Sequence, residues 1–121
     1  MAVAVAVTDM NVQDKYVTLY GTITPSGSYA TGGDTLNITG ATLPPGASIP
    51  FTGLPVSFWI FGQTISGYVY SYVWGTTNAN GKLGVQQNAA GAGALAQIAA
   101  AAYPAGVTSD VIRFEATYRK A

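Results

Sequence analysis

The sequence predicts an all-β fold in one domain, and three observations carry this prediction. Fifteen glycines and six prolines separate short runs rich in Val, Ile, Thr, Tyr and Phe, which are the residue types that strands favour. No stretch sustains the hydrophobic period of an amphipathic helix. With 121 residues, the chain has the size of one domain. We therefore expect a single β-sandwich or jelly-roll-like domain over residues 9–121, preceded by an extended N-terminal arm over residues 1–8. A small closed barrel is the alternative.

The N-terminal arm alternates alanine with valine, so Val3, Val5 and Val7 would share one face of an extended strand. An unpaired strand of this kind invites aggregation, and we expect the arm to be paired in the native state. It can add to its own sheet, or it can reach a sheet of a neighbouring subunit or capsid protein by strand addition. We favour the second alternative slightly, because the polar residues 9–15 would act as a spacer.

Residues 16–23 (YVTLYGTI) form the next predicted strand, with Val17, Leu19 and Ile23 on one face. The chain from 25 to 55 is rich in loops. Gly32 and Gly33 predict a tight turn with positive φ, and residues 36–39 predict a short edge strand.

Two apolar runs, 56–61 and 68–74, follow as a predicted hairpin. An Asn-Gly turn signal at residues 80–81 precedes another strand over 82–87. The alanine-rich residues 89–102 predict one short helical turn inside a long loop. The last strand, 111–119, turns four residues inward and three charged residues outward. The inward residues are Ile112, Phe114, Ala116 and Tyr118, and the outward ones are Arg113, Glu115 and Arg119.

Catalytic chemistry finds little support in this composition. The chain has no histidine and no cysteine, which removes the usual general base and the commonest metal ligands. The five acidic residues are isolated along the sequence, and no glycine-rich phosphate-binding motif occurs. We expect no catalytic residue, no cofactor site and no metal site, and hence a protein that is not an enzyme.

Nucleic acid and membrane partners are also disfavoured. Phosphate binding requires a basic stripe, whereas the five Lys and Arg residues are scattered apart from the pair at 119–120. No apolar run approaches the roughly 20 residues of a membrane span. The apolar run at the N-terminus is too short for a signal peptide and carries no basic residue. These features, with the absence of cysteine, favour assembly in a reducing cytoplasm.

The low charge content points toward an assembly. Only 8% of the residues are charged, whereas about a quarter are charged in an average domain. Five acidic residues balance five basic ones, so little repulsion would keep copies apart. We infer that much of the surface is covered by partners. The alternative is a surface kept in solution by neutral Thr, Ser and Asn side chains.

One aromatic row stands out. Tyr68, Tyr70, Tyr72 and Trp74 would lie on one face of a strand. Such a row suits a subunit interface or the core, because Tyr and Trp are enriched in both settings. It could also stack against sugar rings. The predicted interface residues are Val3, Val5, Val7, Tyr68, Tyr70, Tyr72 and Trp74.

Five tracts in this order resemble the small decoration (cement) proteins of tailed-bacteriophage heads. They are YVTLYGTI at 16–23, SYATGGDTL at 28–36, GYVYSY at 67–72, NGKL at 80–83 and VIRFEATYR at 111–119. The resemblance implies an all-β subunit on the outside of the capsid, bound to the major capsid protein and to itself as a trimer or, in some relatives, a dimer. It carries no catalytic residues. The proline-rich residues 40–55 and the alanine-rich connection depart from the family pattern.

The sequence thus predicts a structural virion protein, assembled in the bacterial cytoplasm, that stabilises a phage head by bridging major capsid subunits. We expect homotrimers, with dimers as the alternative. Two other functions stay open. One is a phage tail or fibre component, and the other is a carbohydrate-binding module that uses the Tyr68–Trp74 strand.

Overall fold

The computed structural model describes residues 3–51, 53–62, 68–88, 95–98 and 100–120. Strands dominate these residues, and the prediction of an all-β fold is confirmed. The strands are β1 (Val3–Val12), β2 (Tyr16–Pro25), β3 (Asp34–Leu36), β4 (Ser57–Gly62), β5 (Tyr68–Val73), β6 (Gly81–Asn88), β7 (Leu95–Gln97) and β8 (Ile112–Arg119). A 3₁₀ turn, η1 (Ile38–Gly40), and one short helix, α1 (Ala105–Thr108), complete the described elements.

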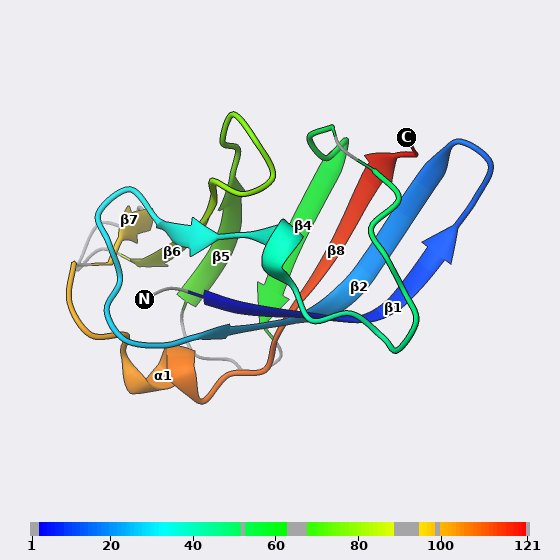
Figure 1. Cartoon of the computed structure of the whole chain (residues 1–121). Helices are drawn as coiled ribbons and strands as arrows, with labels where there is room; N and C mark the ends of the chain where they lie inside the picture. Colours follow the sequence, from blue (N-terminus) through cyan, green and yellow to red (C-terminus); the bar gives the residue numbers. More distant parts are fainter. Residues whose placement is uncertain (1–2, 52, 63–67, 89–94, 99, 121) are drawn as a thin grey trace.

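The strands form two antiparallel sheets. The first sheet has the order β1-β2-β8-β4, and Figure 1 shows these four strands side by side. The second sheet has the order β3-β6-β5, with β7 paired to β6. The predicted hairpin of 56–61 with 68–74 is wrong, because β4 pairs with β8 and β5 pairs with β6. The β-sandwich or jelly-roll-like arrangement, with a small closed barrel as the alternative, stays a prediction.

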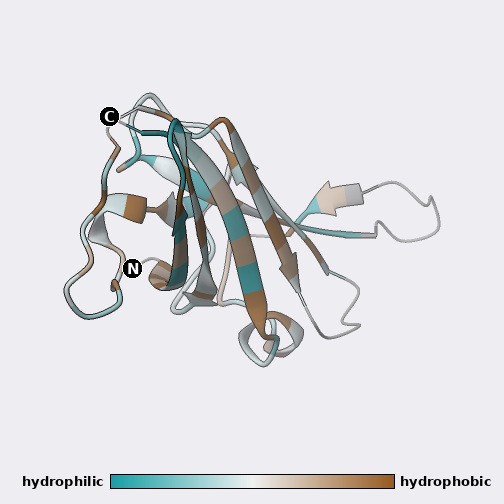
Figure 2. Ribbon diagram, turned by 90° about the vertical axis from the view of Figure 1, so that its right-hand side faces the viewer, coloured by the Kyte–Doolittle hydropathy of each residue, from teal (hydrophilic) through white to brown (hydrophobic). Residues whose placement is uncertain are grey.

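Buried residues of both sheets form one hydrophobic core. Along β2 and β8 buried residues alternate with more exposed ones, as the period of two requires, and Figure 2 shows the resulting bands of hydropathy along the strands. Phe58 of the first sheet stacks on Tyr72 of the second, with ring centroids 4.1 Å apart, and lies 5.4 Å from Phe114. These three rings join the two sheets. The inward and outward faces predicted for β8 are confirmed.

The prediction that the N-terminal arm leaves the domain is wrong. β1 pairs antiparallel with β2 from Val3↔Pro25 to Val12↔Val17, and the side chains of Val3, Val5 and Val7 are buried in the core. The strand continues past residue 8, so residues 9–12 are not a spacer. The pairing is local, since three residues connect the two strands, and a short loop costs little entropy to close. The arm therefore belongs to its own sheet.

The loops agree with the predictions in part. Gly32 and Gly33 have φ values of 89° and 116°, which confirms the tight turn. The edge strand expected over 36–39 is instead β3, which ends at Leu36 and is followed by η1. In the alanine-rich stretch, residues 95–97 form β7 rather than a helical turn, because they pair with the edge of β6. Residues 89–94 and 99 of that stretch lie outside the described residues.

Candidate interaction surface

The predicted aromatic row on β5 faces the core. Tyr70 is 6% exposed and Tyr72 is 7% exposed, and Tyr68 is half-buried against the core. The Tyr70 hydroxyl donates a hydrogen bond to Asp110 Oδ2 at 2.8 Å, and burial raises the pKa of Tyr72. The interface prediction is therefore wrong for Tyr70 and Tyr72, and their rings are not free to stack on sugars. The same correction holds for the valines of β1, whose side chains are buried in the core.

Trp74, at the end of the same row, is 48% exposed. Its ring meets Tyr72 edge-on at 5.0 Å, and its Nε1–H points at the carbonyl oxygen of Pro55 at 3.4 Å. Leu54 and Val56, on either side of Pro55, are exposed as well. We call Leu54, Val56 and Trp74 the Trp74 patch. It is an exposed apolar cluster where β4 begins and β5 ends.

The most aromatic exposed surface lies elsewhere, on the side of the first sheet that faces away from the core. We call this side the outer face. Trp59 and Phe61 of β4 are 65% and 49% exposed, and Tyr16 and Tyr20 of β2 are also exposed. They lie outward because the residues that alternate with them along the strands point into the core. Those inward residues are Phe58, Ile60, Val17 and Leu19.

Strand register arranges the outer face in two central rows. The Glu115 row consists of Tyr20, Glu115 and Trp59, which are directly opposite one another across β2, β8 and β4. The Arg113 row, one step along the strands, consists of Thr22, Arg113 and Phe61. Each row thus holds one charged residue beside one or two aromatic rings. Hydroxyl groups fill the row beyond Glu115, where Thr18 and Thr117 hydrogen-bond through their Oγ1 atoms at 3.2 Å.

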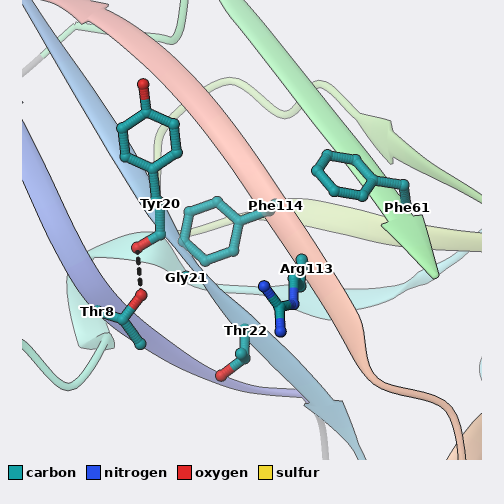
Figure 3. A pocket seen from close by; sticks show the side chains of 7 residues that line it. All are labelled: Thr8, Tyr20, Gly21, Thr22, Phe61, Arg113 and Phe114. Atoms are coloured by element: carbon teal, nitrogen blue, oxygen red, sulfur yellow. Dashed lines mark hydrogen bonds between the residues drawn. The ribbon is translucent and has the colours of Figure 1, made fainter. Parts of the chain in front are cut away.

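A cavity of about 320 Å³ opens on the outer face (Figure 3). Its lining residues are Thr8, Tyr20, Gly21, Thr22, Phe61, Arg113 and Phe114. A Cβ at Gly21 would collide with the backbone carbonyl of Ala6 and with the ring of Phe114, so only glycine allows β1 and Phe114 to approach this closely. Thr8 Oγ1 donates to the carbonyl oxygen of Tyr20 at 3.2 Å and closes one side of the cavity.

The charges of the outer face are not paired within the described part of the chain. Neither Arg113 nor Glu115 forms an ion pair with any residue that the structure describes. Arg119 lies at the end of β8, and its guanidinium carbon is 5.8 Å from the centre of the Tyr16 ring, within the range of a cation–π contact. The face therefore offers rings, hydroxyl groups and both signs of charge to a partner.

The buried carboxylate of Asp34 accepts a hydrogen bond from Tyr103 Oη at 2.8 Å; burial above all, and then this hydrogen bond, raise the pKa of Tyr103. Among the described residues no group of three or more acidic side chains is placed to hold a metal ion. No helix in the same part of the chain is long and apolar enough to cross a membrane.

Trp59 and Phe61 were missed as surface residues because residues 56–61, apart from Ser57, form an apolar run without alternation. The signal that could have identified them lies in the neighbouring strands. β2 and β8 each carry one polar and one apolar face, and the register then assigns alternate residues of β4 to the polar side.

Comparison with protein-family models, curated protein sequences and solved structures returned no match for this chain.

Proposed function

We propose that this protein is a capsid decoration protein, a non-enzymatic virion component that binds the outside of a phage head and bridges major capsid subunits. One observation carries the proposal: the outer face exposes Tyr16, Tyr20, Trp59 and Phe61 together on a chain in which only 8% of residues are charged. Aromatic side chains with few charges are typical of the centres of protein–protein interfaces. Large exposed apolar patches on a small protein mark interaction sites.

Two exposed apolar surfaces suit a bridging role. The outer face belongs to the first sheet, and the Trp74 patch lies at the start of β4 and the end of β5. A decoration protein needs contacts with other copies of itself, as trimers or dimers, and contacts with the major capsid protein. We assign the Trp74 patch to the capsid, because Leu54 belongs to the proline-rich residues 40–55, which depart from the family pattern, and Val56 directly follows them. Loops on a rigid scaffold often carry the residues that contact a partner.

The proposed mechanism is thermodynamic. A ligand that binds only the assembled head stabilises it by the free energy of binding. Each oligomer that holds several capsid subunits multiplies this effect, because the second contact is intramolecular.

The test is co-sedimentation with phage heads that lack the protein, with Trp74→Ser compared with Val69→Ser. Both side chains are exposed, but Val69 lies on the opposite side of β5 from the Trp74 row. We expect Trp74→Ser to lose occupancy on the heads and Val69→Ser to retain it. No co-sedimentation of the parent protein with any head would overturn the proposal, and binding to isolated tails would reassign the protein to the tail.

A carbohydrate-binding function is the second candidate, and one observation favours it. Tyr20, Trp59 and Phe61 lie exposed on one sheet face beside the hydroxyl groups of Thr22 and Thr18, which is a surface that sugar rings can stack on. This version uses the outer face in place of the Tyr68–Trp74 strand. Retardation of the protein in polysaccharide affinity gels, abolished by Trp59→Ala, would support it.

A further inference from the structure

The two central rows of the outer face are complementary to each other. The Arg113 row holds a cation and Phe61, while the adjacent Glu115 row holds an anion and Trp59. The two charged residues come from the same strand and the same face, two positions apart. A surface with this pattern matches a copy of itself that has been turned by 180°.

We infer that the outer face binds the outer face of a second copy of this chain in a two-fold dimer. This inference rests on the proposed function, because it names the partner of the outer face, one of the two exposed apolar surfaces described above. The two-fold axis lies in the plane of the interface, across the strands, between the Arg113 row and the Glu115 row. Each row of one copy then faces the other row of the second copy.

This symmetry satisfies the charges reciprocally. Arg113 of each copy meets Glu115 of the other, so two ion pairs form from groups that have no ion-pair partner among the described residues. Arg113 lines the 320 Å³ cavity together with Tyr20 and Phe61, and the carboxylate of the opposing Glu115 enters there. Aromatic walls displace water from the pair and strengthen it. The charge pattern thus selects one orientation of the second copy.

The aromatic residues are matched by the same operation. Trp59 faces Phe61 of the second copy, and Phe61 faces its Trp59, which gives two reciprocal ring contacts. Tyr20 faces Thr22 in the same way. Face-to-face sheets pack about 10 Å apart and within about 30° of parallel, a separation that Arg and Glu side chains span together.

The size of the face sets the expected affinity. Four strands of about eight residues, about 4.8 Å apart with about 3.4 Å per residue, cover roughly 500 Å². Two copies would bury roughly 1,000 Å², at the low end of specific interfaces, and we expect a dissociation constant on the order of micromolar. The dimer is therefore reversible.

The test is a charge-reversal set measured by sedimentation velocity across the micromolar range. Arg113→Glu alone and Glu115→Arg alone each place like charges opposite one another at both pairs, and we expect each to weaken the dimer at least about tenfold. An equimolar mixture of the two variants should form a heterodimer, because one variant then presents two acidic side chains to the two basic side chains of the other. The variant that carries both substitutions should dimerise again. Lys82→Glu, which changes the charge equally but lies on β6, should match the parent protein.

Three outcomes would overturn the inference: a parent protein that stays monomeric, single variants that dimerise like the parent, or a mixture that does not associate. Thermal melts confirm that each variant is folded, and the mixture tests the pairing even if one variant is less stable. Occupancy on phage heads is measured separately. A dimer that binds no head would contradict only the proposed function, and head binding by a monomer would contradict only this inference.

Discussion

Strands β4 and β5 are both rich in aromatic residues, but they use them in opposite ways. On β5 the aromatic row turns inward, and Tyr70 and Tyr72 are buried. On β4 the rings divide between the two faces: Phe58 packs against the core, while Trp59 and Phe61 are exposed. The difference follows from the paired strands. Trp59 and Phe61 lie opposite the charged residues Glu115 and Arg113 of β8. Tyr70 and Tyr72 lie opposite the buried residues Val85 and Leu83 of β6. An aromatic row therefore identifies a shared face, and the paired strand decides whether that face is core or surface.

The largest expected effect comes from deleting residues 2–8. The deletion removes most of β1 and the buried side chains of Val3, Val5 and Val7, each worth about 1.5–3 kcal/mol of burial. This loss is comparable with the whole stability of a small domain, about 5–15 kcal/mol. We expect the cooperative thermal transition to disappear. A truncated protein that keeps its melting temperature would show that the arm does not belong to the core.

The comparison is sharpest at two adjacent residues of β4. Phe58→Ala removes a buried ring that contacts both sheets, and we expect a loss of about 3–5 kcal/mol in the free energy of unfolding. Trp59→Ala removes an exposed ring and should change stability by no more than about 0.5 kcal/mol. Urea denaturation measures both. Equal losses would mean that the two faces of β4 are not distinguished as described.

How much of this could be predicted from the sequence depended on contrast between the faces of each strand. In β8, Arg113 and Glu115 alternate with apolar residues, and both faces were predicted correctly. In β4 both faces are apolar, so Trp59 and Phe61 carried no signal in their own run. The pairing of β1 with β2, and of β4 with β8 rather than β5, depends on which segments meet in space. Local sequence patterns do not specify such contacts.

A smaller effect is expected at the floor of the outer-face cavity. A methyl group at Gly21 would meet the carbonyl oxygen of Ala6 and the ring of Phe114, so Gly21→Ala must separate β1 from β2 locally. We expect a loss of about 1–3 kcal/mol, as for other overpacked sites. Gly53→Ala is the matched control, since nothing lies within 4 Å of its added Cβ, and it should leave the urea midpoint unchanged.

The smallest effect concerns the hydroxyl group of Tyr72, which is buried without a hydrogen-bond partner among the described residues. Its ring stacks on Phe58, so Tyr72→Phe keeps the aromatic contact and removes only an unsatisfied polar atom. Such a replacement is neutral or slightly stabilising, by up to about 1 kcal/mol at neutral pH.

The same substitution has a larger effect in alkaline solution. Burial raises the pKa of Tyr72 above its ordinary value, so the folded protein holds this proton more tightly than the unfolded chain does. A tyrosine in the unfolded chain ionises near pH 10, as in model peptides. The stability linked to this proton is therefore complete below about pH 10 and falls as the pH rises above it. Burial also raises the pKa of Tyr118, and the nearby Tyr72 adds to that shift. We expect Tyr72→Phe to move the alkaline unfolding midpoint, followed by circular dichroism, to higher pH. Tyr16→Phe, at an exposed ring on the outer face, should leave this midpoint where it is, and equal shifts for the two variants would contradict the assignment of Tyr72 to the core.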